Sequence, residues 1–268
     1  MSVEPRFIRR RGAWAVSLAC TAIAFAASHG LSQVLALGPL AAYAIGFSCV
    51  VAATLGAALF APRTVRVVAP IVIAVLCALA CAYALAAPAG WPIALAISIA
   101  LLAGGTALGS LVGTRIEHAG HLLFVALASA LADVFSVTSP EGPSAAIAKS
   151  DLALRIAAVS WPMIGSGSIE AFLGVGDVVF TGLYIATARR HELPLRRTVL
   201  ALAAGYCATM LAVLVLQVAV PALPFLGGAM LIAHPEARQP PVAERRRGFV
   251  VLSVMAALFL VLLFRPRN

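Results

Sequence analysis

Two aspartates lie where a charge is costly. Asp177 closes the tetrapeptide Gly174-Val175-Gly176-Asp177, the glycine-aspartate motif, inside an apolar stretch of membrane length. Asp133 lies near the end of the preceding apolar stretch, and the proline motif, Pro221-Ala222-Leu223-Pro224, lies at the edge of a later one. Acids inside membrane segments are rare and usually functional, so both aspartates are candidate site residues.

Two aspartates together have the chemistry to hydrolyse a peptide bond. One carboxylate takes a proton from water while a protonated partner polarises the carbonyl and later protonates the amine. Two carboxyl groups a few Å apart in a partly desolvated site cannot both ionise comfortably, so the pair holds one shared proton near neutral pH. Neither aspartate suffices alone, and the sequence does not assign the acid or the base.

The small residues and imino acids around the aspartates suit such a site. The two glycines leave no side chain beside Asp177, which lets a substrate backbone approach and loosens the helix locally. The two prolines remove amide donors, which is tolerated at membrane depth only where the backbone lines a cavity. Backbone exposed at Ala222 and Leu223 could bind an unwound substrate as an added strand.

Composition indicates a polytopic membrane protein. The 268 residues are 62% hydrophobic and 11% charged, with a mean hydropathy of +1.03, which does not suit a water-soluble domain. The net charge of +9 comes from arginines between apolar runs, so it indicates topology and anionic headgroups rather than nucleic acid. The five cysteines lie in apolar runs without a metal-binding pattern, and no metal or organic cofactor is expected.

The apolar runs predict an all-α fold with about nine transmembrane helices. The runs are 13–36, 39–61, 67–87, 91–113, 119–137, 165–188, 198–219, 222–233 and 249–264. Three segments are expected: an N-terminal bundle (1–117), the catalytic helices (118–234), and a basic loop with an extra helix (235–268). In the fourth run, Gly105, Gly109 and Gly113 form a ridge of small residues that should pack closely against a neighbouring helix.

Arginine-rich loops alternate with arginine-poor loops along the chain. Placing every basic loop on the inside puts the amino terminus inside, and it brings Asp133, Asp177 and Pro221 to the same leaflet. The helix carrying Asp177 would then run from outside to inside. We expect an integral, multi-pass protein of a prokaryotic inner membrane.

The motifs resemble those of the GxGD intramembrane aspartyl proteases, the presenilin and signal-peptide-peptidase superfamily, in a prokaryotic form. The resemblance covers roughly residues 119–233 and is carried by Asp133-Val134-Phe135-Ser136-Val137, by Leu173 to Val179, and by Pro221-Ala222-Leu223. It implies a presenilin-like bundle with Asp133 and Asp177 as the catalytic dyad. The supporting residues that it implies are Gly174, Gly176, Pro221, Ala222 and Leu223. Transmembrane or signal-peptide-like helices in the bilayer would be the substrates.

Three alternatives stay open. Family members usually carry Tyr before the first aspartate, whereas this chain has Ala132, which leaves a proteolytically inactive homologue possible. A transporter or channel could use the two aspartates as proton or cation sites. The prepilin peptidases also use Gly-x-Gly-Asp, but they usually continue with Lys where this chain has Val178. A homo-oligomer is also compatible with the sequence.

Overall fold

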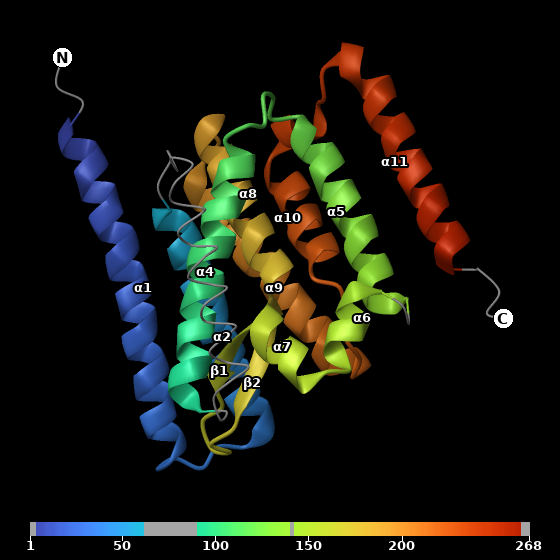
Figure 1. Ribbon diagram of the computed structural model, residues 1–268. Helices are drawn as coiled ribbons and strands as arrows, with labels where there is room; N and C mark the ends of the chain where they lie inside the picture. Colours follow the sequence, from blue (N-terminus) through green and yellow to red (C-terminus); the bar gives the residue numbers. More distant parts are fainter. Residues whose placement is uncertain (1–3, 62–89, 140–141, 264–268) are drawn as a thin grey trace. The chain divides into compact units, whose positions relative to one another are not determined.

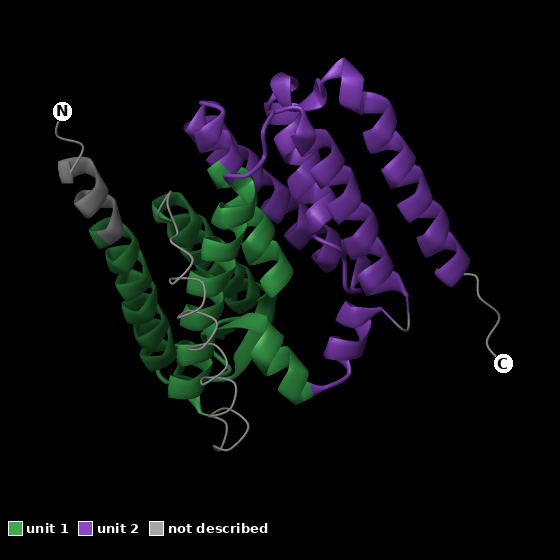
Figure 2. Ribbon diagram, turned by 45° about the horizontal axis from the view of Figure 1, so that its top comes forward, with its two compact units in different colours: residues 1–113, 151–186 green, residues 114–150, 187–268 purple. Residues whose placement is uncertain are grey.

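The computed structural model describes residues 4–61, 90–139 and 142–263. The described chain forms two compact units, and each unit is built from two separate stretches of sequence (Figure 2). Unit 1 comprises Met1–Gly113 and Asp151–Ala186, and unit 2 comprises Thr114–Ser150 and Thr187–Asn268. The expected run 67–87 lies outside the described residues.

Unit 1 is a helical layer with a small sheet against it. Its elements are α1 (Glu4–Ser32), α2 (Pro39–Phe60), α4 (Trp91–Gly113), α7 (Asp151–Ala157), β1 (Ala158–Pro162), β2 (Ile169–Gly174) and most of α8 (Val175–Arg190). Within this unit, α1, α2 and α4 pack against one another and all three contact β1 (Figure 1). Pro39 opens α2, where a proline fits because the first amides of a helix have no partner within it.

Among its described residues, unit 2 has helices joined by short connections and no strand. It contains α5 (His121–Thr138), α6 (Pro143–Ala148), α9 (Leu195–Leu216), α10 (Leu223–Ala233), the 3-10 turn η1 (Pro235–Arg238) and α11 (Val242–Leu263). α10 lies between α5 and α9 and packs against both, while α11 packs against α5 (Figure 1). The short helix α10 therefore lies between α5, which carries Asp133, and α9.

Five segments of the described chain are long and apolar enough to cross a membrane. They are Gly12–Ser32, Pro39–Phe60, Trp91–Gly113, the segment His121–Ala148 that contains α5, and Leu195–Leu216. These helices make the chain a predominantly helical, membrane-embedded protein, as its composition predicted. The prediction of about nine spans is wrong. At 1.5 Å per residue, the 11 residues of α10 reach only about 16 Å, against a hydrocarbon core of about 30 Å.

The prediction of a helix over 165–188 is also wrong, because the first part of this range contains a strand. β1 and β2 form an antiparallel pair, with Trp161 opposite Glu170. The turn between them contains Gly165 and Gly167, whose φ angles of +103° and +69° are readily adopted only by glycine. The described residues are therefore predominantly helical with one small two-stranded sheet, which is compatible with the predicted all-α class.

Hydrogen bonds fix the hairpin to the helices of unit 1. The indole Nε1 of the buried Trp161 donates to Ser28 Oγ of α1 at 3.2 Å. Ser160 of β1 exchanges two bonds with Ser98 of α4: its amide donates to the Ser98 hydroxyl at 3.0 Å, and that hydroxyl donates to the Ser160 carbonyl at 3.1 Å. β1 is fully buried, so these bonds satisfy polar groups that water does not reach.

The glycine ridge of α4 packs against α8, which confirms the close packing predicted from its spacing. A Cβ at Gly109 would lie 2.0 Å from the Val179 carbonyl oxygen, and one at Gly113 would lie 2.5 Å from that of Leu183. Neither position has room for a methyl group. The ridge thus sets the position of α8, whose first turn carries Asp177.

Candidate functional site

Asp133 lies on α5 in unit 2, where its carboxylate meets the proline motif. The side chain is half-buried, and its Oδ2 accepts a hydrogen bond from the backbone N–H of Leu223 at 2.9 Å. The two residues are 90 positions apart in the sequence. The structure therefore brings together two of the three signals that the sequence singled out.

The amide of Leu223 is available because it begins α10. The first amides of a helix have no partner within it, and Pro224 has no amide hydrogen at all. The next two amides, of Phe225 and Leu226, both donate to the Ala222 carbonyl at 3.1 Å. The Asp133 carboxylate thus caps α10 at the positive end of its dipole, where a negative charge is stabilised.

Close packing holds α10 in place behind this contact. A Cβ at Gly205 of α9 would lie 3.0 Å from the Phe225 carbonyl oxygen, so the two helices touch through their backbones. At the other end of α10, the buried His234 shares a 2.9 Å hydrogen bond between its Nε2 and the Thr198 hydroxyl. Burial lowers the pKa of His234, with opposing contributions from the charges of Glu236 and Arg197.

The chain after α5 folds back onto the helix end that carries Asp133. The Ser136 hydroxyl lies 2.7 Å from the Ser144 hydroxyl and accepts the Ser144 amide at 2.9 Å. A side chain at Gly142 would collide with the Ser136 carbonyl. These contacts fix the last turn of α5 one turn beyond Asp133.

Asp177 lies in unit 1, at the junction of β2 and α8. Gly174 is the last residue of β2, and α8 begins at Val175. The Asp177 Oδ2 accepts the backbone N–H of Gly174 at 3.2 Å. An acid at the third helical position that reaches back to the amide before the helix is one arm of a capping box, so Asp177 has a structural role besides any chemical one.

Packing within the described part of the chain does not require the two glycines of the glycine-aspartate motif. A Cβ at Gly174 would meet the Asp177 carboxylate at an ordinary 3.7 Å, and one at Gly176 would meet none of the described residues within 4 Å. Both glycines are exposed. Among the described residues, the space beside Gly176 is therefore open.

The predicted site residues therefore form two groups. Asp133 and the proline motif belong to unit 2, whereas Asp177 and its two glycines belong to unit 1. Sequence reasoning missed the hairpin that leads into Asp177. Its signal was the Gly165-Ser166-Gly167-Ser168 turn between two short segments that contain aromatic residues.

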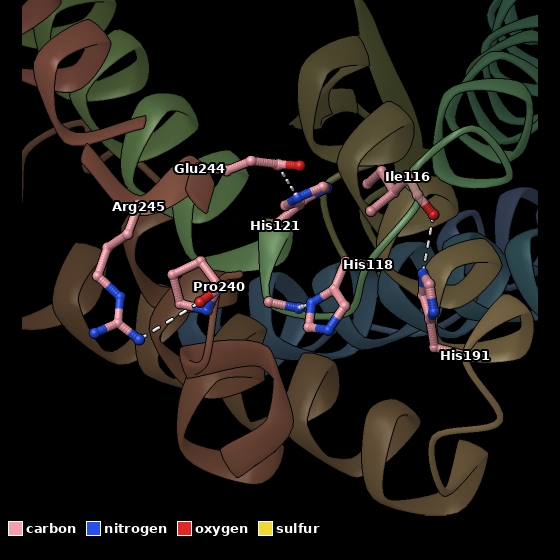
Figure 3. A network of polar contacts seen from close by, with 8 residues as sticks. Ile116, His118, His121, His191, Pro240, Glu244 and Arg245 are labelled. Carbon is pink, nitrogen blue, oxygen red and sulfur yellow. Dashed lines mark hydrogen bonds and ion pairs between the residues drawn. The ribbon is translucent and has the colours of Figure 1, made fainter. Parts of the chain in front are cut away.

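A second polar cluster lies in unit 2 near the start of α5 (Figure 3). The His121 ring and the Glu244 carboxylate of α11 approach to 2.6 Å. His118 accepts the amide two residues further on, and His191 Nε2 lies 2.9 Å from the Ile116 carbonyl oxygen. Among the residues that the structure describes, no three metal-ligating side chains lie close enough to hold an ion.

Comparisons of the chain with protein-family models, with curated proteins and with solved structures find no match. The features that bear on function are the two aspartates, the backbone around each of them, and the resemblance of their motifs.

Proposed function

We propose that the protein is an intramembrane aspartic endopeptidase that hydrolyses peptide bonds within transmembrane or signal-peptide-like helices. Asp133 and Asp177 would be its catalytic dyad. The observation that carries the proposal is the hydrogen bond from Leu223 N to Asp133 Oδ2. Two elements that the resemblance assigns to a single site meet there, across 90 residues of sequence.

The chemistry follows from the two carboxyl groups. One of them, as a carboxylate, accepts a proton from the attacking water, while the other, as the neutral acid, polarises the scissile carbonyl. After attack, the acid gives its proton to the departing amine. The dyad again holds one proton, now on the carboxyl group that accepted it from water, and a new water replaces the one consumed. The Leu223 amide holds the Asp133 carboxylate in one orientation, which favours proton transfer in a fixed direction.

The substrate must unwind before it is cut, because helical hydrogen bonds shield its peptide groups. The β1–β2 hairpin offers a strand edge to which an unwound substrate segment could bind. In the described part of the chain, β2 pairs only with β1, so its second edge has no neighbouring strand. Much of β2 is exposed, and it ends three residues before Asp177. A substrate strand added at this edge would be carried toward the acid.

The three aspartates of the chain allow a matched test. Asp133→Asn and Asp177→Asn each remove a proposed catalytic acid, while Asp151→Asn removes an exposed one on α7. Purified full-length protein in liposomes is mixed with a helical fluorogenic reporter, with and without a transition-state-analogue inhibitor of aspartyl proteases. We expect cleavage by the wild type and by Asp151→Asn, its loss in the other two variants, and inhibition by the analogue.

Wild-type rates in Asp133→Asn or Asp177→Asn would remove that residue from the dyad. A wild-type protein that cleaves no helical reporter, but moves protons or cations in a manner that depends on both aspartates, would instead assign it to transport.

A further inference from the structure

A groove in unit 2 lies between α5 and α11, away from Asp133 and the proline motif. It is shallow and largely open, with a volume of about 480 Å³, and this volume is within the range of roughly 300–1,000 Å³ that is common for small-molecule sites. The lining residues are His121, Phe124, Ala128, Glu244, Arg247, Gly248, Val251 and Leu252.

The groove has one polar end and a long apolar wall. His121, Glu244 and Arg247 lie at the polar end, at the start of their helices, and the remaining lining residues are apolar. Gly248 shapes the wall, because a Cβ there would lie only 2.4 Å from the Phe124 ring. The Phe124 ring in turn meets Phe249 edge-on, at 5.6 Å between centroids.

The charge at the polar end is positive. Three consecutive arginines, Arg245 to Arg247, are exposed in the first turns of α11. Glu244 lies against His121 at 2.6 Å, so its carboxylate is already engaged (Figure 3). An anionic group would therefore be attracted to this end, and Arg247 is the arginine that lines the groove.

We propose that this groove binds one anionic phospholipid of the surrounding bilayer. Its phosphate would lie against Arg247, and one acyl chain would lie along Phe124, Ala128 and Val251. Beyond its arginines α11 is apolar and exposed, at Phe249, Val250 and Val254 among others. An anionic lipid matches both the positive charge at one end of the groove and its apolar wall. A soluble anion would match the positive charge alone.

Matched pairs on α11 test the two halves of the site. Arg247→Gln removes the arginine of the groove, and Arg246→Gln removes an equal charge that does not line it. Val251→Trp fills the groove. Val254→Trp adds the same bulk outside it, and both valines are similarly exposed, at 66% and 63%. Native mass spectrometry of the full-length protein measures retention of phosphatidylglycerol and of phosphatidylcholine with the same acyl chains.

We expect phosphatidylglycerol to be retained preferentially, with about a fivefold loss of apparent affinity in Arg247→Gln and a smaller loss in Arg246→Gln. Val251→Trp should reduce retention of both lipids, while Val254→Trp should not. Equal losses in the two arginine variants would show diffuse attraction and overturn the proposal. Unchanged lipid retention in Val251→Trp would also overturn the proposal. Displacement of the lipid by a helical peptide, or a dimer that only Val251→Trp disrupts, would overturn it as well, because the groove would then bind a protein segment.

Discussion

The backbone N–H of Gly174 donates a hydrogen bond to the Asp177 carboxylate, with 3.2 Å between nitrogen and Oδ2. The acid that the sequence marks as chemical therefore also caps the start of α8. Stability and chemistry at Asp177 are separable, because an amide side chain keeps an oxygen that can accept this bond but cannot act as an acid or a base.

Substitutions at Asp177 should separate these two roles. Asp177→Asn should abolish cleavage and keep the unfolding temperature of the wild type, whereas Asp177→Ala should abolish cleavage and also destabilise the protein by about 1 kcal/mol. Thermal unfolding followed by circular dichroism, beside the reporter assay, measures both. Equal stability of the Asn and Ala variants would mean that the capping bond contributes nothing.

Gly176 should matter for activity and not for folding. Gly176→Ala adds a Cβ that meets no atom of the described residues within 4 Å, so the variant should be as stable as the wild type, or more stable by up to about 1 kcal/mol. If a substrate backbone passes beside Asp177, the added methyl should lower the cleavage rate. A variant that cleaves the reporter as fast as the wild type would contradict a substrate path over this residue.

Gly109 should show the opposite pattern. Because a Cβ there would lie 2.0 Å from the Val179 carbonyl, Gly109→Ala forces α4 and α8 apart and should cost about 1–3 kcal/mol. Gly30→Ala in α1 is the control, since a Cβ at Gly30 would lie within 4 Å of no atom in the part of the chain that the structure describes. Chemical or thermal unfolding in detergent compares the two variants. A Gly109→Ala variant as stable as Gly30→Ala would show that α4 and α8 are not in close backbone contact at this position.

His234 should make stability depend on pH. Burial lowers the pKa of its ring from the ordinary 6.5, so the folded state favours the neutral form. This contribution to stability is present above about pH 6.5 and is lost as the pH falls through the lowered pKa. We expect a fall in unfolding temperature on acidification that is smaller in His234→Gln. His191→Gln is the control. If the unfolding temperatures of His234→Gln and the wild type depended on pH in the same way, His234 would not be the cause of the acid sensitivity.

The candidate residues are conspicuous in the sequence because a charge or a break in the helical backbone is costly in a membrane. An aspartate in an apolar run stands out in any composition, and so do the two prolines that flank Ala222 and Leu223. The glycine ridge of α4 was predictable for a related reason. Three glycines at four-residue spacing fall on one helix face and allow a close approach there.

The hairpin and the number of spans were not predictable by the same reasoning. Hydrophobicity alone does not show whether an apolar run such as 165–188 forms a strand, a helix or one after the other, because both elements can be buried. Only the turn glycines Gly165 and Gly167 distinguish the two. The division into two units depends on contacts between segments far apart in sequence, such as Trp161 with Ser28, and no local pattern reports such contacts.

The most direct measurement is the separation of the two acids in the membrane. Asp133→Cys and Asp177→Cys are combined in a chain whose native cysteines are replaced, and bifunctional thiol reagents of graded length are added. Asp133→Cys with Asp151→Cys is the control pair. Mass spectrometry of the tryptic peptides detects the cross-link. A dyad that shares one water predicts efficient linking of the first pair by the shortest reagents. Linking only by spacers longer than about 12 Å, well beyond hydrogen-bond reach through one water, would contradict it.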